Sequence, residues 1–108
     1  MVVTSSSLLG ACGTMDDWMI LKGSVRDADG HRPKECAVRL YDYKTDSLVG
    51  TERIEADNFR ASIRASPRKD YRVRIGCAGT EEFVSGPMRT APTFAPIDLG
   101  SMVLRRKN

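Results

Sequence analysis

The residues that could do chemistry are few, and most of them lie in one short turn. His31 is the only histidine of the chain, and it sits among Gly, Pro and Asp in the segment ADGHRPKE at 28–35. The run Asp27-Ala28-Asp29-Gly30 has the look of an oxygen-ligand calcium loop. However, the bidentate acidic residue that such a loop needs further along is missing, because Glu35 is offset and follows Lys34. No G-x-x-x-x-G-K phosphate loop occurs. We therefore expect a surface turn, with no catalytic residue, no metal and no cofactor.

The three cysteines are Cys12, Cys36 and Cys77, and the first of them lies in an unusual segment. Residues 1–14 carry no charge, whereas all 17 Lys and Arg and all 14 Asp and Glu residues follow them. An apolar stretch that ends in small residues is typical of the back half of an export signal. Leu9-Gly10-Ala11-Cys12 resembles the lipobox of bacterial lipoproteins, in which the cysteine is lipidated on sulfur and becomes the new N-terminus.

That resemblance implies a division of the first 17 residues. Residues 1–11 are expected to be a truncated signal-peptide remnant, and residues 12–17 the lipidated Cys12 with its tether. Three acyl chains hold a protein stably on a membrane without a spanning helix. The alternative is a tail in which Cys12 is incidental.

The rest of the chain alternates apolar and polar residues with period two, and turn residues separate the alternating stretches. This pattern predicts an all-β fold, a single antiparallel sandwich of about seven strands over residues 18–104, followed by a solvated basic tail at 105–108. The expected strands are 18–27, 36–43, 48–54, 59–65, 71–77, 81–90 and 97–104, with Pro87 limiting the sixth.

Four stretches resemble the transthyretin-like, or carboxypeptidase-regulatory-like, β-sandwich family. They are GSVRDADGHRP at 23–33, CAVRLYD at 36–42, NFRASI at 58–63 and YRVRIGCAG at 71–79. Asn58 stands where the family usually has Gly, and Asn tolerates the same left-handed turn. The fold's hydroxyisourate hydrolase uses several His and a C-terminal Tyr-Arg-Gly-Ser-like motif. This chain has one His and ends VLRRKN, so that activity is not expected.

The resemblance also implies how two of the cysteines pair. In transthyretin-like sandwiches the strand matching 36–43 lies antiparallel to the strand matching 71–77. Cys36 then begins one strand beside Cys77 at the end of the other, and a disulfide between them is expected. The odd cysteine count also fits an exported protein whose Cys12 carries lipid. The alternative is two free cysteines in the core.

Arginines dominate the positive charge, and several are expected on one surface. If the pairing above holds, Arg39, Arg72 and Arg74 share the outer face of one sheet, with Tyr41 beside them. Guanidinium groups beside an aromatic ring can hold carboxylates or phosphates by forked hydrogen bonds. The alternative is a solvated face whose charges prevent edge pairing. A net charge of +3 does not argue for nucleic acid.

Together these observations predict a non-enzymatic envelope lipoprotein. It would be lipid-anchored on the periplasmic side of the outer membrane, because Gly13 after the cysteine resembles the sorting pattern for that membrane. It would serve as a binding or scaffold module for another envelope protein, for instance by strand addition. Its oligomeric state is left open. The alternatives are the outer-membrane lipoprotein of a type VI secretion system and a carbohydrate- or peptidoglycan-binding module.

Overall fold

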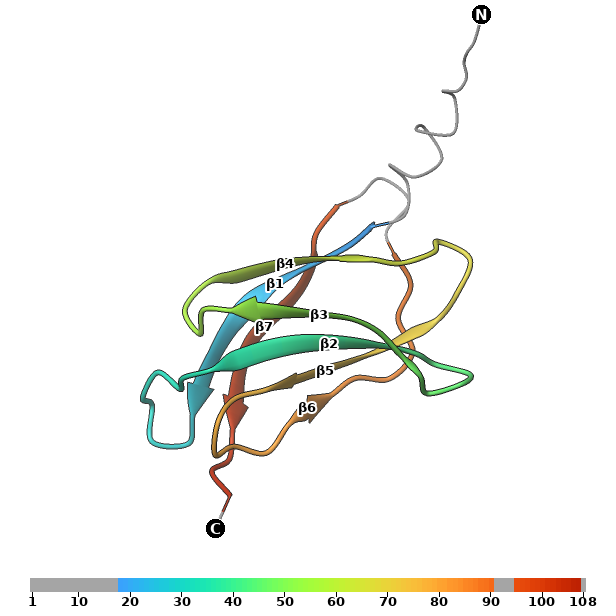
Figure 1. The fold of residues 1–108 in the computed structure, drawn as a ribbon. Coiled ribbons are helices and arrows are strands. Elements are labelled where there is room, and N and C mark those ends of the chain that lie inside the picture. Colours follow the sequence, from blue (N-terminus) through green and yellow to red (C-terminus); the bar gives the residue numbers. More distant parts are fainter. Residues whose placement is uncertain (1–17, 91–94, 108) are drawn as a thin grey trace, which may run out of the picture.

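The computed structural model describes residues 18–90 and 95–107, and these residues form two packed β-sheets (Figure 1). One sheet has the order β4-β1-β7 and the other the order β3-β2-β5-β6. No helix occurs in the described residues, so none there is long and apolar enough to cross a membrane. The strands are β1 (Trp18–Asp27), β2 (Cys36–Asp42), β3 (Leu48–Ile54), β4 (Phe59–Arg64), β5 (Tyr71–Gly76), β6 (Phe83–Val84) and β7 (Ile97–Leu104).

The core lies between the two sheets and is built by strict alternation along the central strands. Successive side chains of a strand point to opposite faces, so every second residue of β4 and β5 is buried, as is every second residue of β2 up to Leu40. Both sheets contribute to this interior, as in an aligned sandwich. The largest fully buried side chains are Met19, Leu21, Val25, Val38, Leu40, Val73 and Ile75. The all-β sandwich expected from the sequence is confirmed.

The turns follow from local chemistry. Gly30 has a φ of 83° after β1, and Asn58 has a φ of 45° before β4, in the left-handed region that the sequence led us to expect. The stretch 81–90 is the main exception among the strands. Only Phe83–Val84 forms a ladder, because Pro87 has no amide hydrogen to donate. Beyond it, Met88 and Tyr71 exchange two backbone hydrogen bonds in an isolated bridge.

One pair of strands departs from the antiparallel arrangement. β7 runs parallel to β1, with a bulge where Gly100 adopts a φ of 72°. The physical reason is the path of the chain after β6. Met88 already lies beside Tyr71, at the end of the sandwich where β1 begins, so β7 starts from that end and runs in the direction of β1.

The disulfide between Cys36 and Cys77 is present, as expected. β2 pairs antiparallel with β5, which places the start of β2 beside the end of β5. Residues 105–107, predicted to be a solvated basic tail, have exposed side chains, and their backbone extends the ordered sandwich. The amide of Glu81 donates to the carbonyl of Arg105 at 2.7 Å, and the amide of Lys107 donates to the carbonyl of Gly79 at 2.8 Å. Cys12 lies outside the described residues.

Candidate functional site

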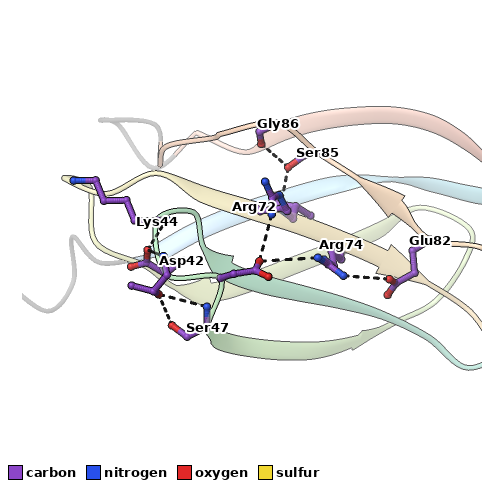
Figure 2. Close-up of polar contacts among 11 residues, drawn as sticks. Asp42, Lys44, Ser47, Arg72, Arg74, Glu82, Ser85 and Gly86 are labelled. Carbon is purple, nitrogen blue, oxygen red and sulfur yellow. Dashed lines mark hydrogen bonds and ion pairs between the residues drawn. The ribbon is translucent and has the colours of Figure 1, made fainter.

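The four residues predicted to bind an anion or a partner do come together on the outer face of the four-stranded sheet. β2 supplies Arg39 and Tyr41, and β5 supplies Arg72 and Arg74. The register pairs Arg39 with Arg74 and Tyr41 with Arg72. We call this set the arginine–tyrosine face. Figure 2 shows Arg72 and Arg74 projecting from the same side of β5.

Two carboxylates that the sequence pattern does not single out neutralise much of the positive charge of this face. Asp46 lies 3.3 Å from Nη1 of Arg72 and 4.0 Å from Nη2 of Arg74. Glu82 lies 3.9 Å from Nη1 of Arg74 and 3.4 Å from Nη1 of Arg39. Both carboxylates come from connections between strands, Asp46 from the β2–β3 hairpin and Glu82 from the segment before β6. The face therefore alternates cations and anions, and one positive charge remains in excess.

Two tyrosine rings of this region are already occupied by guanidinium groups. The Cζ atom of Arg74 lies 5.0 Å from the centre of the Tyr41 ring, and that of Arg72 lies 4.8 Å from the centre of the Tyr43 ring. Such cation–π contacts fix the direction of the arginines. Each guanidinium also covers one face of its ring, so a sugar could stack on that face only by displacing an arginine. The buried Nε of Arg74 has no hydrogen-bond partner among the described residues.

The turn after β1 brings Asp27, Asp29 and His31 together, with ligand atoms all within 4.8 Å of one another. The Asp27 carboxylate is nevertheless committed to the protein. One oxygen accepts hydrogen bonds from the backbone amides of Asp29 and His31, each at 2.9 Å, and the other accepts one from Arg106 at 3.2 Å. This is the geometry of a turn held by its aspartate, which agrees with the polar turn expected from the sequence.

The same contacts set the ionisation of Asp27. Burial of its carboxyl group raises the pKa, but the backbone amides of His31 and Asp29, the Coulombic interaction with the His31 side chain and the Arg106 guanidinium together outweigh burial. The pKa of Asp27 is therefore lower than its usual value. The group is ionised at neutral pH and joins the start of the turn to the end of the chain described here.

The side of the sandwich between β6 and β7 is open. β6 and β7 are the last strands of their sheets, and a groove of about 550 Å³ runs between them. Its walls expose Val84 by 50% and Val103 by 67%, while Leu99 and Phe83 line it half-buried. Over Ile97–Leu104, β7 pairs with β1 along one edge only, so its other edge presents backbone donors and acceptors to the groove. Just beyond Leu104, residues 105–107 pair with residues 79–81 and close that end. We call this region the β6–β7 groove.

The opposite side, between β3 and β4, is closed. A Cβ atom on Gly50 of β3 would come within 2.6 Å of Cγ2 of Ile63 in β4, so these two edge strands are already in close contact. The Glu52 carboxylate also reaches from β3 to accept the Ser62 amide on β4, at 3.2 Å. A carboxylate that occupies an edge amide in this way prevents another strand from pairing there. The two sides of the sandwich are thus built differently.

The comparisons with known proteins add no relative: no protein-family model matches the chain, and neither does any curated protein sequence.

Proposed function

We propose that this protein is a non-enzymatic lipoprotein of the bacterial envelope that holds another envelope protein by accepting one of its extended segments as a strand beside β7. Residues 1–11 are then a remnant of the export signal, and Cys12 carries the lipid. The transthyretin-like family remains our proposal for the ancestry of the sandwich. The anchor places the protein on the periplasmic side of the outer membrane.

The export part of the proposal is supported by the three cysteines. Leu9-Gly10-Ala11-Cys12 has the composition of a lipobox. The other two cysteines form a disulfide, a bond that persists in an oxidising compartment such as the periplasm and is rare in the cytosol. A lipid on Cys12 also accounts for the one cysteine that the bond leaves over.

The binding part depends on one observation, the β6–β7 groove. An unpaired strand edge next to exposed valines suits an extended polypeptide, which satisfies the edge by backbone hydrogen bonds and places alternate side chains against Val84 and Val103. The lining carries both signs of charge, with Arg105 beside Glu81 and Glu82, so shape and backbone pairing, and not net charge, would select the partner segment. On the side between β3 and β4, the Glu52 carboxylate opposes such an addition.

Lipidation is tested by intact-mass analysis of the protein purified from its own host. We expect a mass that lacks residues 1–11 and includes a diacylglyceryl group, with a third acyl chain on the new N-terminus. Substitution of Cys12→Ala should abolish this modification. An unmodified chain that still carries residues 1–11 would refute the export part of the proposal.

Strand addition is tested with a photo-crosslinking amino acid placed in the living host at position 103, in the groove, and at position 51, on the outer face of the opposite edge strand β3. We expect a discrete adduct with one envelope protein from position 103 only. The change Val103→Lys, which adds a charge to the edge without disturbing the core, should remove this partner in pull-downs. The matched control Thr51→Lys should retain it. Equal adducts from both positions would refute the groove as the binding site.

A second candidate is recognition of an acidic glycan or headgroup by the arginine–tyrosine face, which keeps an excess positive charge. Binding to isolated peptidoglycan that is lost in Arg72→Ala and Arg74→Ala would favour it. The covered tyrosine rings make this candidate the weaker one.

A further inference from the structure

The topology gathers six strand termini at one end of the sandwich. The register pairs Trp18 with Arg64, which are the start of β1 and the end of β4. It also pairs Asp42 with Tyr71, which are the end of β2 and the start of β5. The starts of β3 and β7 lie at this same end, because β3 follows β2 through a hairpin and β7 is parallel to β1 (Figure 1). We call it the Trp18 end.

The Trp18 end exposes much of the apolar surface that the described residues leave outside the core. Of their six exposed large hydrophobic side chains, Trp18, Tyr43, Leu48 and Val49 lie here, and the other two line the β6–β7 groove. The turns at the opposite end of the sandwich, at 28–35, 55–58 and 77–82, expose none. Exposed apolar groups that gather at one end of a small domain indicate a contact surface.

Cations surround these apolar groups. Arg64 lies with its Cζ atom 5.5 Å from the centre of the Trp18 ring, and it lines a shared hollow with Val49, so Trp18, Arg64 and Val49 form a continuous surface. The loops at this end add Lys44 and Arg68, and neither these two nor Arg64 forms an ion pair within the described residues. The acidic groups of the same loops are engaged: Asp42 pairs with Lys69, Asp70 with Arg89, and Asp46 with Arg72 and Arg74.

The short tether between Cys12 and Trp18 limits how far this surface can lie from the membrane. If Cys12 carries the lipid, only five residues separate it from Trp18, and the six residue steps between them span at most about 20 Å when fully extended. The Trp18 end is then the part of the sandwich nearest the bilayer. An indole ring beside arginines is the combination favoured at a membrane interface, where the ring lies at headgroup level and cations meet lipid phosphates.

We propose that the Trp18 end is a membrane-contact surface, which rests against anionic phospholipid headgroups and orients the sandwich on its anchor. This inference rests on the proposed lipid anchor for its geometry, but the surface itself can be tested without the lipid. The chain offers its own reporter, because Trp18 is its only tryptophan.

The test uses the full chain with Cys12→Ser, the Cys36–Cys77 disulfide intact, and vesicles of phosphatidylethanolamine and phosphatidylglycerol or of phosphatidylcholine alone. We expect the fluorescence emission of Trp18 to shift to shorter wavelength with the anionic vesicles only, and the shift to weaken as salt is added. The double change Leu48→Ala with Arg68→Ala keeps the reporter. It should raise the lipid concentration needed for half the shift by about tenfold.

The matched control is Val103→Ala with Arg105→Ala, which also removes one exposed aliphatic and one basic side chain but lies at the β6–β7 groove. It should bind vesicles like the parent chain. An unchanged Trp18 emission with anionic vesicles at low salt, or equal weakening by both double changes, would overturn the inference. If the intact-mass experiment finds no lipid on Cys12, the proposed anchor is refuted. The vesicle measurement is independent of that result, because it uses the chain without a lipid.

Discussion

Asp27 shows how one buried carboxylate can organise the end of a small domain. It lies at the last position of β1 and is only 3% exposed, yet each of its oxygens accepts hydrogen bonds. Two of these come from the turn that follows and one from Arg106, which is 79 residues away in the chain. A buried polar group of this kind stabilises the fold only while its partners are all in place.

We predict that Asp27→Asn lowers the free energy of unfolding at neutral pH. Because the folded state lowers the pKa of Asp27, its contribution is present above the pKa of the unfolded chain and is lost as pH falls through the folded-state value. The parent chain and the variant should therefore differ at pH 7 and converge in strong acid. Urea unfolding across this pH range is the measurement. The exposed Asp29→Asn is the control and should match the parent chain throughout.

Gly50 shows a second, purely steric constraint. A Cβ atom there would overlap Ile63 from the facing strand, and the contact is made by a core side chain with little room to move. We predict that Gly50→Ala destabilises the protein by roughly 1–3 kcal/mol, the usual cost of overpacking. Thermal and urea unfolding would measure it. Gly86→Ala meets nothing within 4 Å and should be close to neutral, so equal losses in the two variants would contradict this account.

The arginine–tyrosine face shows the limit of residue-level reasoning from sequence. Alternation along each strand predicts which way Arg39, Arg72 and Arg74 point, because strand parity is a local property, but that they share a face also needed the strand pairing implied by the family resemblance. The carboxylates beside them could not be placed in the same way. Asp46 and Glu82 come from connections, and where a connection folds back depends on turn geometry that no period reveals.

At the scale of the elements, β2 and β5 carry both the predicted face and the disulfide. The bond closes a loop across 41 positions of sequence. On the chain-entropy argument, it stabilises the folded state by about 2–4 kcal/mol. We predict that Cys36→Ala with Cys77→Ala lowers the free energy of unfolding by this amount, as measured by urea unfolding. Adding a reductant to the parent chain should give the same loss, and reductant should leave the double variant unchanged.

The strands themselves were largely predictable, since clear alternation and strong turn residues bound most of them. The bounds expected for 18–27, 48–54 and 97–104 agree with β1, β3 and β7. The prediction of a strand over 81–90 was wrong outside Phe83–Val84, because the apolar residues do not alternate over a long enough run and Pro87 interrupts the ladder. The parallel pairing of β7 was missed because direction depends on the path of the preceding chain, not on the strand's own residues.

For the whole molecule, the sandwich has two unlike sides and two unlike ends. Composition and period gave the two-layer fold, because any half-buried strand must pack its apolar face on another. Composition and period do not predict that one side is closed and the other open, because this depends on which edge strands lie next to each other. Glu52 closes the side between β3 and β4, whereas the short β6 leaves β7 uncovered. The proposed partner contact lies at the unpaired edge of β7, and the proposed membrane contact lies where apolar side chains are exposed at the Trp18 end.

The parallel pairing of β1 and β7 has a mechanical consequence. These neighbouring strands run in one direction, so a pull that enters at Trp18 and leaves beyond Leu104 is carried along both of them. The hydrogen bonds between the two strands are perpendicular to such a force and share it. They must therefore break together, not one after another. A protein fastened at one extremity and tugged at the other is thereby loaded in shear, the direction in which a ladder of hydrogen bonds is hardest to tear.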